Sequence, residues 1–135
     1  MVAHPVIFDV IVAPGFVLTE MAGVVDVLRL ANRVSKRDVF GWQFLSARGG
    51  PVSSSSGAVV ETLPLTTRTE AAYAVALGNA DPSHPELSLM PTIGRYTARG
   101  ARVILLAEAA SRYIADKGPD AAKHTTHWEN RAVLL

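Results

Sequence analysis

GARVILLAEAASRYIADKGPDAAKHTTHW, residues 100–128, is the most informative segment of the sequence. Residues 102–107 form a short apolar run rich in β-branched side chains, which is typical of a strand covered on both faces. Residues 109–117 favour a helix, and Gly118-Pro119 is a stop signal. A strand that runs directly into a helix lifts one side chain above the carboxyl edge of a sheet, and many α/β enzymes hold a nucleophile there.

The composition indicates one globular domain. The chain has 135 residues, of which 49% are hydrophobic and 19% charged, with a net charge of +1. No basic patch with interleaved aromatic residues is present, so this chain by itself is a poor candidate for binding nucleic acid. The absence of cysteine excludes disulfides, thiolate metal sites and cysteine nucleophiles. The N-terminus lacks the features of a signal peptide and no apolar run could span a bilayer, so we expect a cytoplasmic protein with no membrane partner.

The remainder of the chain predicts strands alternating with helices, and hence a parallel sheet covered on both faces. Strands are expected at residues 6–13, 42–47 and 73–78, and a small hairpin at residues 52–61. Residues 86–99 favour a helix that Pro91 would kink or shorten. Thr19 is the expected N-cap of the first helix and Asn32 its end. The buried stripe of that helix is predicted to contain Met21, Val24, Val25, Leu28 and Ala31.

Thr125-Thr126-His127 resembles the catalytic-histidine segment of the PfpI/ThiJ superfamily, the class I glutamine-amidotransferase-like fold. Residues 126–129 resemble more narrowly the amidase-like sensor domain of AraC-type transcriptional regulators, and so do residues 14–16, Glu20 and residues 25–32. The resemblance implies a flavodoxin-like three-layer α/β/α sandwich with a mostly parallel sheet. It also implies a further C-terminal part, so we expect residues 1–135 to be a single, C-terminally truncated domain without the DNA-binding domain.

The same resemblance predicts a vestigial catalytic site. The superfamily carries a G-x-C-x-G-like pattern at the strand-to-helix turn, where this chain has Leu105-Leu106-Ala107-Glu108-Ala109. Ala107 takes the place of the cysteine, while Glu20 and His127 match the glutamate and the histidine. Without a nucleophile these residues cannot perform acyl transfer. Loss of both glycines also argues against a tight, strained turn.

A ligand site is expected at the carboxyl edge of the sheet, where open α/β sheets bind ligands. Glu108 follows the strand directly, and Asn79 and Asp81 lie in a turn-rich loop after the preceding strand. No histidine or acidic cluster has metal-ligand spacing and no phosphate-binding glycine motif occurs, so we expect neither a metal nor a cofactor. The predicted ligand-binding residues are Glu20, Asn79, Asp81, Ala107, Glu108 and His127.

The leading hypothesis is a catalytically inactive sensor and dimerisation domain of an AraC-type regulator. Its expected partners are a second copy of the chain and a small-molecule effector, with DNA bound only through a domain that this chain does not contain. One alternative is a PfpI/ThiJ-like hydrolase, hydratase or glyoxalase-like enzyme that uses Glu20, Glu108 and His127. A second alternative is an oligomerisation module or a gene fragment.

Overall fold

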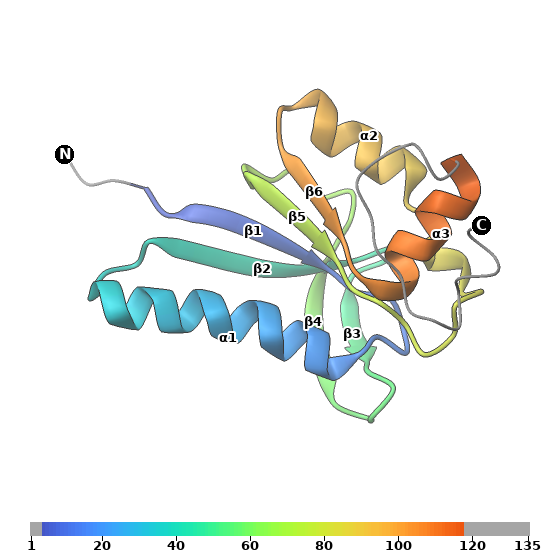
Figure 1. Ribbon diagram of the computed structural model, residues 1–135, viewed down its shortest axis with the longest axis horizontal. Coiled ribbons are helices and arrows are strands. Elements are labelled where there is room, and N and C mark those ends of the chain that lie inside the picture. Colours follow the sequence, from blue (N-terminus) through green and yellow to red (C-terminus); the bar gives the residue numbers. More distant parts are fainter. Residues whose placement is uncertain (1–3, 118–135) are drawn as a thin grey trace.

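A six-stranded, mostly parallel sheet with helices on both faces forms the fold (Figure 1). The computed structural model describes residues 4–117, so the predicted features at residues 118–135 lie outside the described part. The strands are β1 (Val6–Ile11), β2 (Phe40–Ser46), β3 (Gly50–Ser53), β4 (Val59–Pro64), β5 (Tyr73–Ala76) and β6 (Arg102–Leu105). The helices are α1 (Leu18–Ser35), the 3-10 turn η1 (Pro85–Leu87), α2 (Met90–Ala98) and α3 (Ala107–Lys117).

The strand order is β3-β4-β2-β1-β5-β6, which places β1 in the middle as its apolar sequence predicts. β1 pairs in parallel with β2 and β5, and β5 pairs in parallel with β6. β4 runs parallel to β2, while β3 folds back antiparallel onto β4. The mostly parallel sheet and the predicted hairpin are therefore both confirmed.

Two apolar layers lie on opposite faces of the sheet, because successive side chains of a strand point to opposite sides. Val10 of β1 and Val75 of β5 face α1, together with the fully buried Phe16. Ile11 and the alanines on either side of Val75 face α2 and α3 instead. α1 covers the first face with the predicted stripe: Leu28 is buried, and Met21, Val24, Val25 and Ala31 are half-buried. This arrangement is the predicted three-layer α/β/α sandwich.

The ends of α1 differ from the prediction. The helix begins at Leu18, one residue before Thr19, and Val17 occupies the N-cap position without a side-chain hydrogen bond. It continues past Asn32 to Ser35, and Lys36 ends it in the left-handed conformation with φ of 58°. The side chain of Asn32 instead fastens the start of β2, since it both donates to and accepts from the backbone of Phe40 at 2.8 Å. Thr19 and Asn32 were therefore wrong as helix boundaries.

Two further predictions need correction. The long helix expected at residues 86–99 is divided into η1 and α2, and Pro91 lies in the first turn of α2, where its missing N–H has no intrahelical partner to lose. β6 was expected to be buried on both faces, yet it is the edge strand of the described sheet. Arg102 and Ile104 on β6 are exposed. Within residues 4–117, no helix is both long and apolar enough to cross a membrane.

A buried carboxylate joins the middle of the sheet to α2. Asp9 on β1 is fully buried and accepts three side-chain hydrogen bonds. Gln43 of β2 donates to Oδ1 at 2.7 Å, while Thr69 and Tyr96 donate to Oδ2 at 2.6 Å. A buried carboxylate is stable only when it is hydrogen-bonded in this way. Burial and the Asp9 carboxylate raise the pKa of Tyr96, so this phenol remains a donor.

The variant Tyr96→Phe is expected to destabilise the fold by about 1.5–3 kcal/mol, because it removes one hydrogen bond from a buried charged group. The matched control is Tyr73→Phe. The ring of Tyr73 stacks on Phe8 at 4.6 Å, and its hydroxyl has no hydrogen-bond partner within residues 4–117. Urea denaturation of both variants gives the comparison, and equal losses of stability would show that the Asp9 bond contributes nothing specific.

Candidate functional site

The strand-to-helix turn keeps a tight conformation although its glycines are absent. Ala107, the first residue of α3, has φ of 46°, in the left-handed region that non-glycine residues rarely adopt. The N–H of Leu106 is fixed to the carbonyl of Ala76 at 2.9 Å, which joins the turn to β5. The expectation that loss of the glycines weakens this turn was therefore wrong. Such a conformation costs about 1–3 kcal/mol and persists only where its surroundings impose it.

Two carboxylates converge on consecutive backbone amides just beyond β5. Glu20, in the first turn of α1, accepts a hydrogen bond from the N–H of Gly78 at 2.9 Å. Glu108, in the first turn of α3, accepts one from the N–H of Asn79 at 3.0 Å. Carboxylates in the first turn of a helix are favoured by the helix dipole. Helices from both faces of the sheet thus contribute one acid each to the same loop.

Gly78 lies at the centre of this arrangement. A side chain at this position would approach the methyl group of Ala107 to 2.8 Å and a carboxylate oxygen of Glu20 to 3.0 Å, and it would collide with the carboxylate of Glu108. Gly78 does not have a positive φ, so its backbone conformation does not require glycine. The lack of space for a side chain does. The structure brings together Glu20, Ala107 and Glu108, three of the residues singled out in the sequence. Sequence reasoning missed Gly78, and its position as the last residue of a predicted strand is the one signal that points to it.

The site is acidic and open to solvent. Ala107 is exposed, while Glu20 and Glu108 are half-buried. Burial raises the pKa of Glu20 above its ordinary value of 4.5 and the charge of Glu108 raises it further, whereas the Gly78 N–H acts in the opposite direction. The site therefore holds two carboxylates whose charges repel one another, next to the exposed side chain of Ala107.

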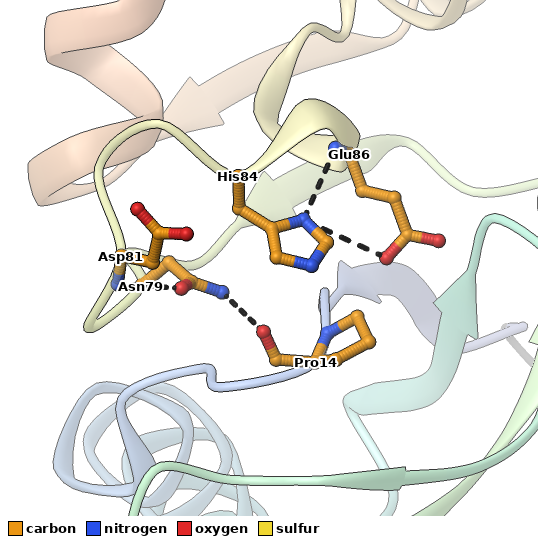
Figure 2. A network of polar contacts seen from close by, with 5 residues as sticks. All are labelled: Pro14, Asn79, Asp81, His84 and Glu86. Atoms are coloured by element: carbon orange, nitrogen blue, oxygen red, sulfur yellow. Dashed lines mark hydrogen bonds and ion pairs between the residues drawn. The ribbon is translucent and has the colours of Figure 1, made fainter.

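Asn79 donates its backbone N–H to Glu108, while its side chain bonds within the neighbouring loops. Its side chain is buried; the amide donates to the carbonyl of Pro14 at 2.8 Å and accepts from the N–H of Asp81 at 2.8 Å (Figure 2). Asp81 is exposed and accepts two hydrogen bonds from Ser83, which lower the pKa of its carboxyl group. Within residues 4–117, no hydrogen bond or ion pair joins Asp81 to Glu20 or Glu108.

His84 and Glu86 form a second polar group in the same loop (Figure 2). Nδ1 of His84 accepts from the N–H of Glu86 at 3.2 Å and thereby caps η1. The same nitrogen lies 3.9 Å from Oε2 of Glu86, an oxygen that is enclosed and has no hydrogen-bond partner within the described part of the chain. Residues 4–117 hold no group of three or more side chains suited to bind a metal. His127 lies outside the described residues.

The comparisons with known proteins agree with this architecture. No known protein-family model and no curated protein matches the sequence. Among solved structures, the chain is similar to an AraC family transcriptional regulator from Pseudomonas putida, with 25% identity and a TM-score of 0.78 over 96% of this chain and 71% of that one. It is also similar to a DJ-1 superfamily protein from Agrobacterium tumefaciens, with 17% identity and a TM-score of 0.71 over 94% and 67% of the two chains.

A third similar structure is a ThiJ/PfpI domain protein from Brachyspira murdochii, with 10% identity and a TM-score of 0.65. The alignment covers 97% of this chain and 76% of that one. The chain therefore has the PfpI/ThiJ-type fold, as the motif residues predicted.

Replacing Glu20 by Gln is expected to change how stability depends on pH. The raised pKa means that the folded state binds this proton more tightly than the unfolded chain does. The contribution of Glu20 to stability is thus complete below about pH 4.5 and is lost as the pH rises through the higher folded pKa. Gln stays neutral and can still accept from Gly78, so the variant should gain stability relative to the wild type as the pH rises.

Urea denaturation at a series of pH values between about 4 and 7.5 measures this difference. The slope of the unfolding free energy against pH reports the proton uptake on folding. Glu61→Gln is the control, since Glu61 is an exposed acid on β4. A difference between Glu20→Gln and wild type that stays constant across this range would contradict the predicted sign.

Proposed function

We propose that this chain is a catalytically inactive, ligand-sensing and dimerising domain of an AraC-type transcriptional regulator. The observation that carries the proposal is Ala107, which has no lone pair to attack a substrate and yet occupies the tight turn between two carboxylates. The similarity to an AraC family regulator over 96% of the chain supports the choice of protein class. DNA would be contacted by a domain that this chain does not contain.

The effector best suited to the site is a small cation with nitrogen as its charged group. Glu20 and Glu108 both direct carboxylates toward the loop at Gly78, so a cation placed there would relieve their mutual repulsion. Ammonium and guanidinium groups also form the strong, charge-assisted hydrogen bonds that carboxylates accept. The exposed methyl group of Ala107 would leave the site open for such a ligand to enter.

Binding can be tested with a panel of primary amines, amidines and quaternary ammonium compounds, each paired with an uncharged analogue. At least one cation should raise the melting temperature of the purified protein saturably, since a ligand that binds the folded state stabilises it. Glu108→Gln should weaken that binding roughly tenfold or more, because it removes a charged partner. Glu61→Gln, which removes an exposed acid from β4, should bind as the wild type does.

The same experiment tests the enzyme alternative. The raised pKa of Glu20 favours that alternative, because a carboxyl group that holds its proton more tightly is better suited to act as a general acid. A bound compound that is steadily converted to product, with turnover lost in Glu108→Gln, would establish an enzyme in place of a sensor. Failure of every cation to bind, or equal binding by Glu108→Gln, would overturn the effector site.

The proposed dimer interface is an apolar stripe on the outer face of α1. Val27, Leu30 and Val34 repeat at helical spacing and are 65%, 46% and 81% exposed. They lie away from the stripe that packs on the sheet, so nothing within the described residues covers them. A second copy of the chain, packing α1 against α1, would bury this face in a closed two-fold dimer.

Val34→Glu should shift the protein from dimer to monomer, because a charged side chain would be buried in the proposed interface. Its effect on the stability of one subunit should be within about 0.5 kcal/mol, as for other exposed sites. The control is Val59→Glu on β4, whose side chain is 60% exposed. Sedimentation velocity reports the assembly, and a wild-type protein that is monomeric, or a Val34→Glu variant that still dimerises, would exclude this interface.

A further inference from the structure

A hollow of about 370 Å³ lies between α2 and the loop that joins β4 to β5, away from the carboxylate site. The loop crosses the α2 face of the sheet: its residue Thr69 reaches Asp9 in the middle of β1, and Ala72 bonds to the carbonyl of Ile7. None of the residues around Gly78 lines this hollow. Its polar and aromatic lining comes from Thr66, Thr67 and Arg68 of the loop and from Arg95, Tyr96 and Arg99 of α2 and its C-cap.

Three arginines line this hollow, and no acidic residue does. Within residues 4–117, none of Arg68, Arg95 and Arg99 forms a salt bridge, although the same part of the chain contains three ion pairs elsewhere. Grouped like charges repel one another and create a local positive potential that attracts anions.

The floor of the hollow is fixed before any ligand arrives. The guanidinium of Arg99 donates to the carbonyl of Thr69 and lies 4.9 Å from the centre of the Tyr96 ring. Tyr96 is itself held by its bond to Asp9. Asp9 uses both carboxylate oxygens on its three donors and is fully buried, so it is not a partner for the exposed arginines.

We propose that this hollow is a second binding site that accepts a small phosphate-bearing molecule. Guanidinium groups match phosphate oxygens in geometry and bind them through paired, charge-assisted hydrogen bonds. A phosphate group has enough oxygens for three arginines, and the hydroxyl groups of Thr66 and Thr67 offer further donors. The volume and concave shape suit a metabolite of modest size, whereas a nucleic acid backbone needs an extended surface.

Isothermal titration with inorganic pyrophosphate, at constant ionic strength, tests the proposal on the full chain. The wild type should bind saturably with one molecule per chain. Arg68→Gln and Arg95→Gln should each weaken binding roughly tenfold or more, as expected for loss of a charge-assisted hydrogen bond. Both side chains are exposed, so neither substitution is expected to disturb folding, and circular dichroism checks this.

The matched control is Arg33→Gln, which removes the same charge from an exposed position in the last turn of α1. It should bind pyrophosphate like the wild type. The proposal is overturned if the wild type shows no saturable binding, or if Arg33→Gln weakens it as much as the other two variants. It is also overturned if duplex DNA, but not pyrophosphate, binds in a manner that depends on Arg68 and Arg95. Loss of the cation site at Glu108 would leave this result unchanged, since the two sites share no residue.

Discussion

Two consecutive backbone amides, those of Gly78 and Asn79, hold the carboxyl edge of this fold together. Each receives a carboxylate from a different layer: Glu20 from α1 on one face of the sheet and Glu108 from α3 on the other. The loop after β5 would otherwise present unpaired N–H groups at a partly buried position, which is energetically unfavourable. The same two hydrogen bonds therefore satisfy the loop, anchor the first turns of two helices and determine the charge of the candidate site.

This arrangement explains why a strained turn survives without a nucleophile. Ala107 has an unfavourable φ, and no chemical role of its own side chain compensates for it. However, Glu108 follows directly, and its bond to Asn79 requires the chain to turn at this place. Ala107 and both carboxylates pack so closely around Gly78 that no side chain fits there, which leaves little space for another path. The turn is thus maintained by the hydrogen bonds and packing around it, so its geometry alone is no sign of acyl-transfer chemistry.

The sequence predicted the layers of this fold better than the ends of its helices and the exposure of its strands. Alternating apolar strands and amphipathic helices were enough for the parallel sheet and for the stripe around Leu28, because both depend on periodicity. The ends of α1 were missed because Val17 caps without a side-chain bond and Asn32 is used to fasten β2. β6 was misjudged because an apolar run does not reveal whether both faces of a strand are covered: Val103 and Leu105 pack on the core, while Arg102 and Ile104 are exposed.

The residues of the candidate site also differ in whether the sequence alone could indicate them. Glu20 and Glu108 could be singled out from the resemblance and from their positions near an expected turn. Gly78 was missed, since its importance comes from Glu20, Ala107 and Glu108, which all lie far from it in the sequence. The Asp9 network was missed for the same reason: Gln43, Thr69 and Tyr96 are 34, 60 and 87 residues away along the chain. Contacts at such distances leave no local pattern.

In the proposed regulator, α1 provides the physical link between the effector and the second subunit. Its first turn carries Glu20, and its later turns carry Val27 and Val34 on the proposed dimer face. The helix has 18 residues without interruption, so it spans about 27 Å. A cation that draws Glu20 away from Gly78 would remove one of the two hydrogen bonds that join the start of α1 to Gly78, whereas one that binds with this bond intact would keep both. The ligand would then alter assembly only as far as it binds one position of α1 more tightly than the other, and the Glu20–Gly78 bond would be one contact through which the proposed effector acts on α1.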